Sequence, residues 1–232
     1  MLTLLTYPVG FGQFSLSPFS VKAAYLMQLS GQPWQREDLS DPRRMPHRKL
    51  PVLKTDQRLI GDSDNIRTWL EGHGADFDPG LTDVQKGQAQ AFVRMAEEHL
   101  YFHLVMDRWG NDAVWPTVRD TLFQEIPTWI RRPIANKLRR TLRKGLITQG
   151  IARFSDQERL HRLDKDLTAI RAQLTDTPFL FANIPSSADL SVAPMLAAMR
   201  NAPLRTEVAK RVADDTVLSD YIDRMTKAIP LP

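Results

Sequence analysis

The chain contains no cysteine among its 232 residues. This absence excludes disulfide bonds, zinc–thiolate sites and a cysteine nucleophile. If the chemistry of the protein uses a thiol, that thiol must therefore belong to a ligand. The chain also lacks an apolar run of roughly 18 residues, so we expect no membrane-spanning helix. Its first residues show no basic segment and no small-residue cleavage site, so we expect no signal peptide.

The charge balance is close to even. The formal net charge is +4, 25% of the residues are charged and 42% are hydrophobic, as is usual for a globular protein. A charge this small does not indicate nucleic-acid binding. We therefore expect a cytoplasmic protein, long enough for two small domains that each bury a core.

The first part of the chain alternates short β-prone runs with helical patterns. The expected strands are residues 2–7, 34–39, 52–55 and 58–60, and the expected helices are residues 18–30 and 63–71. The order βαβ-ββα predicts a parallel strand pair extended by an antiparallel hairpin. This arrangement is that of an α+β thioredoxin-like domain, which we place at residues 1–75.

The rest of the chain has a helical pattern. Residues 76–84 read as a linker, and residues 85–232 as an all-helical domain. Capping boxes at Ser155–Glu158 and Ser186–Asp189 predict two helix starts. Three prolines, Pro116, Pro127 and Pro133, are expected to divide the intervening segment into shorter helices.

Ser17 and Pro18 stand at the start of the first expected helix. Ser followed by Pro is a common N-cap and N1 pair, and capping alone explains it. A helix N-terminus also offers free N–H groups and partial positive charge, which favour a thiolate over a thiol. The Ser17 hydroxyl can then donate a hydrogen bond to a ligand sulfur.

Two further motifs suit the binding of a peptide. A cis Leu50–Pro51 bond would present the Leu50 main chain to an extended ligand, whereas a trans proline would only begin a strand. Asp62 and Ser63 precede the next helix. They either cap that helix or hold the ammonium and carboxylate of an amino-acid head group. Together with Ser17, these motifs suit a thiol tripeptide with a free α-amino acid end.

The same residues carry a resemblance to a known family. The segments SPFS at 17–20, KLPVL at 49–53 and GDS at 61–63, followed by a helical remainder, resemble a glutathione S-transferase. The segments at 94–109, 150–158 and 178–192 resemble the metaxin-like, or failed-axon-connections-like, branch of that family. The resemblance implies a glutathione-dependent, dimeric protein that conjugates the glutathione thiolate to an apolar electrophile. It leaves open a glutathione-dependent peroxidase or a non-catalytic binding or scaffold protein.

The resemblance also implies roles for individual residues. Ser17 would polarise the glutathione sulfur, Leu50 would pair with the cysteinyl main chain beside cis Pro51, and Asp62 and Ser63 would hold the γ-glutamyl group. Lys49 or His47 would approach the glycine carboxylate.

Tyr7 lies at the end of the first strand. It would either replace Ser17 as the residue that contacts the glutathione sulfur, or only pack against the end of that strand. The electrophile would lie between the domains. The residues predicted to line its pocket, some of them structural, are Phe11, Phe14, Tyr101, His103 and Trp109.

Two other sequence patterns could indicate a binding site, but we expect each to have only a structural role. His99, His103 and Asp107 share one helical face, but we expect packing and His–carboxylate hydrogen bonds rather than a metal site. The basic segment 131–144 carries Ile134, Leu138 and Leu142 at steps of four. We expect a helix with these residues packed and its basic face in solvent rather than a surface for lipid or nucleic acid.

Overall fold

The N-terminal part forms the predicted α+β domain. The computed structural model describes all residues 1–232. Its sheet has the order β2-β1-β3-β4, built from β1 (Leu2–Thr6), β2 (Trp34–Asp38), β3 (Val52–Lys54) and β4 (Leu59–Gly61). Strands β1 and β2 are parallel, and β3 pairs antiparallel with both β1 and β4. The predicted parallel strand pair and antiparallel hairpin of a thioredoxin-like domain are therefore confirmed.

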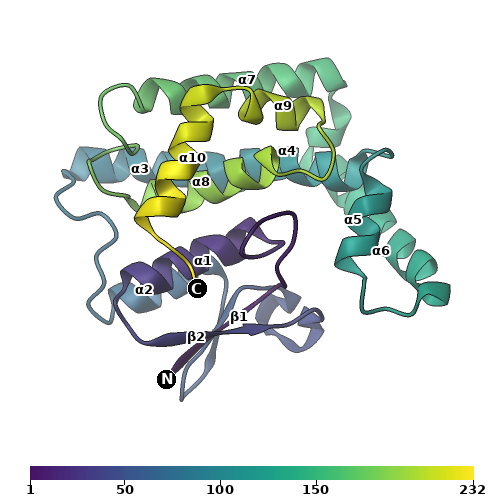
Figure 1. Ribbon diagram of the computed structural model, residues 1–232, viewed down its shortest axis with the longest axis horizontal. Helices are drawn as coiled ribbons and strands as arrows, with labels where there is room; N and C mark the ends of the chain where they lie inside the picture. The colour runs from purple at the N-terminus through teal and green to yellow at the C-terminus, as the bar shows by residue number, and fades with distance from the viewer.

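The two helices of this domain cover one face of the sheet. Helices α1 (Pro18–Leu29) and α2 (Ser63–Glu71) lie between the sheet and the helical domain (Figure 1). Because strand side chains alternate between faces, Leu4 and Leu53 enter the main core, whereas Leu5 and Val52 pack on the other face. Leu50 joins that second cluster, which holds the segment after β2 against the sheet.

The C-terminal part is entirely helical. Its helices are α3 (Asp83–Met95), α4 (Tyr101–Val105), α5 (Trp115–Leu122), α6 (Thr128–Gln149), α7 (Asp156–Gln173), α8 (Ser187–Arg200), α9 (Glu207–Ala213) and α10 (Thr216–Ala228). Two π-helical segments, Ala96–Leu100 and Met106–Gly110, join α3 and α4 into one long helical stretch. None of these helices combines the length and apolar composition that crossing a bilayer would require.

Helix α8 is the centre of the helical domain. All its residues from Ser187 to Met199 are buried, and it packs against α1, α3, α9 and α10. The chain end after α10 returns beside α1 (Figure 1). The contact between α1 and α8 thus fixes the N-terminal domain on the helical one.

The arm formed by α5 and α6 projects from the body (Figure 1). We expected Pro133 to end a helix here, and this is wrong because Pro133 lies inside α6. Its missing N–H would have bonded to the carbonyl of Trp129. The Trp129 side chain is 80% exposed, so water can solvate that carbonyl instead. Gly150, with φ of 115°, ends α6 in the left-handed conformation.

Candidate functional site

Ser17 occupies the predicted N-cap position of α1 but makes no capping bond. Its backbone is extended, Pro18 follows at the first helical position, and its hydroxyl has no hydrogen-bond partner. The N–H of Phe19 is also without an acceptor in the chain. The interpretation of Ser17 as only a capping residue is therefore wrong. A hydroxyl and an N–H group at the start of α1 are both available to an anionic ligand.

Ser15 fixes the position of Ser17. The buried Ser15 hydroxyl accepts hydrogen bonds from the Ser17 N–H at 3.3 Å and from the Thr6 hydroxyl at 2.9 Å. It donates to the Tyr7 carbonyl at 2.8 Å. These bonds tie the start of α1 to the end of β1. Sequence reasoning missed Ser15, since nothing in the loop sequence distinguishes it from the neighbouring serine.

The Leu50–Pro51 bond is cis. The Leu50 N–H and C=O make no hydrogen bond, although the residue is only 5% exposed. The next carbonyl, that of Pro51, accepts a hydrogen bond from the Asp62 N–H at 3.2 Å. This bond sets the start of α2 beside Leu50. An extended ligand along Leu50 would satisfy both free main-chain groups.

Asp62 and Ser63 form the start of α2. Asp62 has a φ of 81°, and its carboxylate accepts the Asp64 N–H at 2.8 Å, so it does cap the helix. Its side chain is otherwise exposed and can face a ligand ammonium. Ser63 is only 2% exposed, and its hydroxyl makes no hydrogen bond within the chain. An uncommitted hydroxyl at a helix N-terminus suits a carboxylate.

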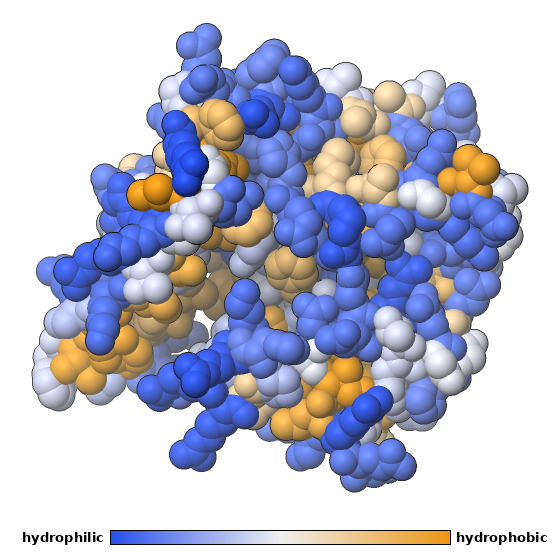
Figure 2. Space-filling view, turned by 180° about the vertical axis from the view of Figure 1, so that it is seen from behind, coloured by the Kyte–Doolittle hydropathy of each residue, from blue (hydrophilic) through white to orange (hydrophobic).

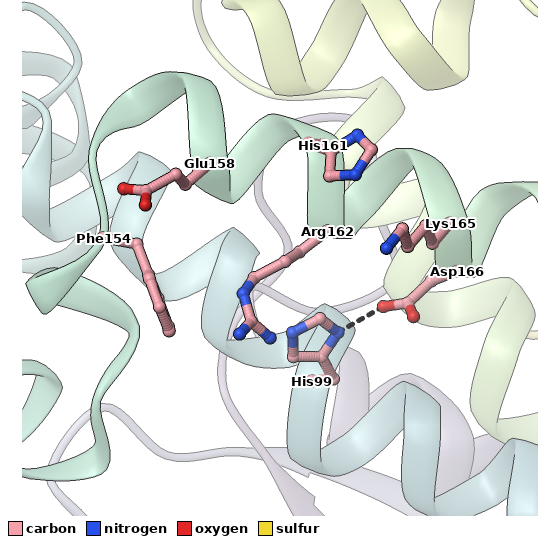
Figure 3. A pocket seen from close by; sticks show the side chains of 7 residues that line it. All are labelled: His99, Phe154, Glu158, His161, Arg162, Lys165 and Asp166. Carbon is pink, nitrogen blue, oxygen red and sulfur yellow. Dashed lines mark hydrogen bonds and ion pairs between the residues drawn. The ribbon is translucent and has the colours of Figure 1, made fainter.

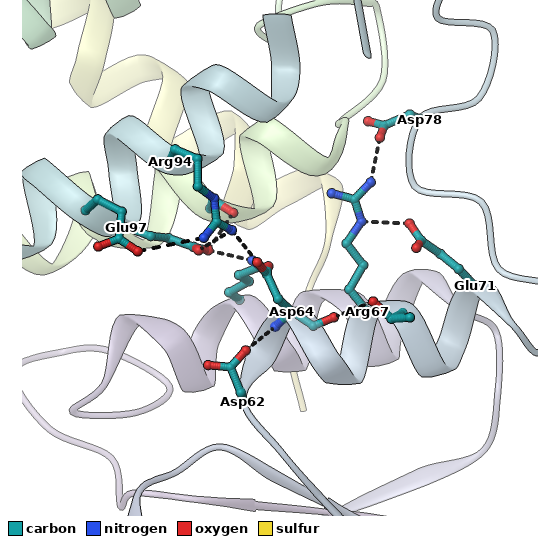
Figure 4. Close-up of polar contacts among 11 residues, drawn as sticks. Asp62, Asp64, Arg67, Glu71, Asp78, Arg94 and Glu97 are labelled. Carbon is teal, nitrogen blue, oxygen red and sulfur yellow. Dashed lines mark hydrogen bonds and ion pairs between the residues drawn. The ribbon is translucent and has the colours of Figure 1, made fainter. Parts of the chain in front are cut away.

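A partly buried network of charges joins the start of α2 to α1 and to the helical domain (Figure 4). The Lys22 ammonium contacts Asp64 at 2.6 Å and Glu97 at 2.5 Å, and Arg94 pairs with the same two carboxylates. Partial burial opposes the ionisation of Asp64. The charges and hydrogen bonds of Lys22 and Arg94 outweigh that effect and hold the pKa of Asp64 below its ordinary value.

Replacing Lys22 with methionine is expected to destabilise the fold by about 3 kcal/mol, because the buried Glu97 carboxylate would lose its closest cation. Lys22 is only 1% exposed. The double variant Lys22→Met, Glu97→Met should regain most of this loss, since no unpaired charge then stays buried. Urea unfolding of both variants measures the effect. A double variant no more stable than Lys22→Met would contradict this account.

Tyr7 lies near the same site but is committed to packing. Its ring packs on the cluster of Leu5, Leu50 and Val52, and its hydroxyl makes no hydrogen bond. Burial, with Tyr101 and Asp41 nearby, raises the pKa of Tyr7 to about 12. The phenol therefore stays protonated at neutral pH, as a hydrogen-bond donor to the sulfur would have to be.

The structure brings only some of the predicted pocket residues together. Phe11 and Trp109 pack on one cluster under α5, and Tyr101 packs edge-on against Phe19 with ring centroids 4.8 Å apart. Phe14 lies elsewhere, against Trp34 and beneath the Arg36 guanidinium. His103 is also separate, because it is buried against His99 on the side of α7.

Arg108 joins these aromatic residues to the loop before α1, and sequence reasoning missed it. Its guanidinium donates to the Leu16 carbonyl at 2.9 Å and lies 5.4 Å from the centre of the Phe11 ring. It forms no ion pair, and its Nε atom is buried without a partner. Burial lowers the pKa of Arg108 to about 10, so it stays charged at neutral pH. A cation beside the Leu16–Ser17 turn favours an anionic sulfur there.

The three residues weighed as a metal site have different partners. His99 pairs through Nδ1 with Asp166 of α7, the Nε2 atom of His103 is buried without a partner, and Asp107 accepts a hydrogen bond from Thr206. No group of three His, Asp or Glu side chains is placed to hold a metal ion. The His99–Asp166 pair agrees with the expected His–carboxylate contact.

A hollow of about 360 Å³ opens beside His99 (Figure 3). It is lined by Phe154 and by charged or polar residues of α7, including Arg162, and the Arg162 guanidinium lies 4.1 Å from the centre of the Phe154 ring. The Ser17, Leu50 and Ser63 side chains do not line it. It is therefore separate from the candidate site.

His103 predicts a loss of stability in mild acid. Burial lowers the pKa of His103 to about 4. The nearby His99, Arg159 and Arg162 lower this pKa further, and the Asp166 carboxylate opposes them. Unfolded histidine takes up a proton near pH 6.5, so the unfolded state binds more protons between pH 6.5 and 4. Stability should therefore fall across this window, by on the order of 2 kcal/mol at pH 5.

Thermal unfolding from pH 7.5 to 5 checks this prediction. The variant His103→Gln cannot titrate, so its stability should vary less with pH than that of the wild type. His161→Gln, which changes an exposed histidine of α7, is the matched control and should keep the wild-type dependence. Equal pH dependence in all three proteins would contradict the role of His103.

Lys49 and His47 lie in the turn just before Leu50. Both side chains are exposed. His47 has a φ of 55° and lines a second hollow of about 520 Å³ between this turn, β4 and α2. The turn is held close to β4, since a Cβ atom at Gly61 would lie 2.7 Å from Pro46. Lys49 makes no ion pair, so its ammonium is free to meet a carboxylate.

The fold and these side chains define a class of protein. A thioredoxin-like domain presents the start of α1, a free main-chain edge beside a cis proline and the start of α2, and an all-helical domain covers α1. This is the architecture of the two-domain glutathione transferases.

The comparisons with known proteins give the family. The model of the glutathione S-transferase N-terminal domain matches residues 18–115, and that of the glutathione S-transferase C-terminal domain matches residues 152–224. Together they match most of the chain. The chain belongs to the glutathione S-transferase family.

Individual proteins that the chain resembles belong to the same family or share its fold. The chain is 28% identical over 235 residues to the isoprene-epoxide glutathione S-transferase of Rhodococcus sp., with 98% of each chain covered. It is 25% identical to metaxin-1 of Sus scrofa, over 88% of this chain and 67% of metaxin-1. The fold is also that of the glutathione transferase GSTFuA3 from Phanerochaete chrysosporium, with a TM-score of 0.67 at 17% identity over 97% and 96% of the two chains. The predicted family, with its metaxin-like character, is thus confirmed.

Proposed function

We propose that the protein binds glutathione along Leu50. The observation that carries this proposal is that the Leu50 N–H and C=O, both nearly buried, have no partner in the chain. The cysteinyl main chain of glutathione would pair with them as a short antiparallel strand. The γ-glutamyl carboxylate would accept from Ser63, and its ammonium would face Asp62. Lys49 or His47 would meet the glycine carboxylate.

We further propose that the bound thiol is activated and conjugated to a small apolar electrophile. The Ser17 hydroxyl would donate a hydrogen bond to the thiolate without forming a covalent bond to it. An apolar epoxide is the substrate class to try first, because the similar Rhodococcus enzyme is named for one. The sulfur would attack an epoxide carbon, the C–O bond would break, and the released alkoxide would take up a proton.

The second substrate would lie between the loop before α1 and the helical domain. Phe11, Tyr101 and Trp109 supply apolar surface there, and Arg108 contributes a fixed positive charge. An opening separates the projecting arm from the N-terminal domain (Figure 2). A cation at this position would stabilise the alkoxide as well as the thiolate.

Calorimetry with glutathione tests the binding proposal. We expect a dissociation constant at or below about 1 mM. The variant Ser63→Ala should bind more weakly by on the order of tenfold, because a ligand carboxylate would lose a charge-assisted hydrogen bond. Ser155→Ala, at the exposed N-cap of α7, should bind as the wild type does. No heat of binding at millimolar glutathione would refute the proposal.

A second candidate function is a non-catalytic binding protein. It is favoured by the similarity to metaxin-1 over most of the chain. Such a protein would bind glutathione or a partner but would turn over neither epoxides, aryl halides nor peroxides. Assays with this panel separate the two functions. The family resemblance also supports a homodimer, which analytical ultracentrifugation would test.

A further inference from the structure

Helix α6 does not pack as its sequence predicts. Ile134 and Leu138 are 43% and 42% exposed, and only Ala135 and Leu146 are buried on the whole helix. The prediction that Ile134, Leu138 and Leu142 pack against the body is therefore wrong for Ile134 and Leu138, whereas Leu142 is half-buried. The body-facing side of α6 is narrow because the arm projects from the domain and meets it along few residues (Figure 1).

The face of α6 opposite Ala135 and Leu146 forms one continuous stripe. We call this stripe the outer stripe, and it consists of Trp129, Pro133, Lys137, Arg140, Lys144 and Ile147. These residues follow one another at steps of three and four, which places them in line along the helix. All six side chains are exposed, and Trp129, at 80%, is the most exposed large hydrophobic residue of the chain.

The charge of this helix has one sign. Between Thr128 and Gln149 there are seven lysine and arginine residues and no aspartate or glutamate. Arg139 and Arg143 pair with Asp112 at the foot of the arm. The three cations of the outer stripe, Lys137, Arg140 and Lys144, form no ion pair. The stripe thus presents uncompensated positive charge between an exposed tryptophan and an exposed isoleucine.

We propose that the outer stripe of α6 binds the surface of an anionic lipid bilayer. Lysine and arginine would meet the lipid headgroups, and Trp129 and Ile147 would enter the boundary between headgroups and acyl chains. Figure 2 shows hydrophobic and hydrophilic side chains interleaved on the projecting arm. A helix of 22 residues is about 33 Å long, and its outer stripe faces away from the buried Ala135 and Leu146, so the stripe can lie along the bilayer surface.

Two other occupants fit the stripe less well. A second copy would bring an identical positive stripe against the first, which like charges oppose. Nucleic acid would satisfy the cations but would leave Trp129 and Ile147 at the two ends of the stripe without an apolar partner. Anionic lipid satisfies both kinds of side chain. The proposal does not depend on glutathione binding, since the stripe lies apart from Ser17 and Leu50.

Sedimentation of the full chain with vesicles tests the proposal. Vesicles of phosphatidylcholine mixed with phosphatidylglycerol should bind the protein, vesicles of phosphatidylcholine alone should not, and added salt should weaken binding. The variant Lys137→Gln, Arg140→Gln, Lys144→Gln should bind on the order of 100-fold more weakly. The control Lys54→Gln, Lys86→Gln, Lys227→Gln removes the same charge from exposed lysines elsewhere and should stay within about threefold of wild type.

Fluorescence adds an independent measurement. Vesicle binding should shift the tryptophan emission to shorter wavelength, and Trp129→Phe should remove most of that shift. Failure to bind mixed vesicles at low salt, or equal binding by the triple variant and its control, would overturn the proposal. Stripe-dependent binding of DNA without vesicle binding would assign the stripe to nucleic acid instead. Self-association that Trp129→Ser abolishes, again without vesicle binding, would assign it to a second copy.

Discussion

Replacing Ser17 with alanine is expected to lower the turnover number of glutathione conjugation by about 100-fold, the usual effect of losing one hydrogen bond to a developing or resident anion. The affinity for glutathione should change little, because Leu50, Asp62 and Ser63 still hold the peptide. The pKa of the bound thiol should rise by roughly one to two units, since a charge-assisted hydrogen bond contributes about 1.5–3 kcal/mol. Steady-state kinetics and the ultraviolet absorbance of the thiolate measure both effects.

Two variants separate this role from its alternatives. Tyr7→Phe should keep most of the rate, because the Tyr7 ring supplies the packing and its hydroxyl makes no hydrogen bond. Ser15→Ala should lower stability, because the bonds that join β1 to α1 are lost. An unchanged rate in Ser17→Ala together with a collapse in Tyr7→Phe would move the sulfur contact to Tyr7. Absence of turnover in the wild type would favour the binding-protein alternative.

Replacing Asp189 with alanine is expected to destabilise the fold by about 3–5 kcal/mol. The Asp189 carboxylate is fully buried and accepts from the Leu180 N–H at 2.9 Å, from the Ser186 N–H at 2.8 Å and from the Tyr221 hydroxyl at 2.8 Å. The variant would leave these donors buried without an acceptor, and each such loss carries a desolvation cost. Urea unfolding followed by circular dichroism measures the change.

The chain contains a matched control for this prediction. Ser155 and Glu158 form the same capping box at the start of α7, with Ser155 N–H to Glu158 at 2.8 Å, but both residues are exposed. Glu158→Ala should cost only about 1 kcal/mol, because water replaces the lost acceptor. A loss in Asp189→Ala no larger than that in Glu158→Ala would show that burial does not set the importance of this box.

Local sequence patterns predicted the structure correctly where residues close together in the chain determine it. Short β-prone runs and the helix between the first two of them predicted the parallel strand pair and the antiparallel hairpin, and the two capping boxes predicted the starts of α7 and α8. The prediction failed at Pro133, because the carbonyl that loses its donor belongs to the exposed Trp129, where water can replace the lost bond. It failed for Ile134 and Leu138 because a periodic apolar stripe does not reveal whether a neighbour covers it.

The candidate site also combines features that local sequence predicts with features that it does not. Ser17, Leu50, Pro51, Asp62 and Ser63 were predicted as site residues from the sequence, because each stands at a fixed position relative to a helix or strand start. Whether a hydroxyl caps its own helix or stays free could not be read from the sequence, since this depends on rotamer and local backbone.

The residues of the second pocket depend on tertiary structure even more. Phe14 and His103 were grouped with Phe11 by residue type, but the loop and helix that carry them turn their rings toward Trp34 and His99 instead. Arg108 escaped notice because its partners, the Leu16 and Ala198 carbonyls, lie about 90 positions away along the chain and no local pattern encodes such contacts.

The sequence by itself determined that any reactive thiol must come from a ligand, that a thioredoxin-like domain precedes a helical one, and which helix and strand starts make up the candidate site. These properties follow from composition and from interactions between near neighbours in the chain. Only the tertiary structure decided that the Ser17 hydroxyl is free, that Arg108 is a buried cation beside it, and that the outer stripe of α6 is uncovered. Burial and pairing are set by contacts between distant segments, and those contacts exist only once the two domains have packed.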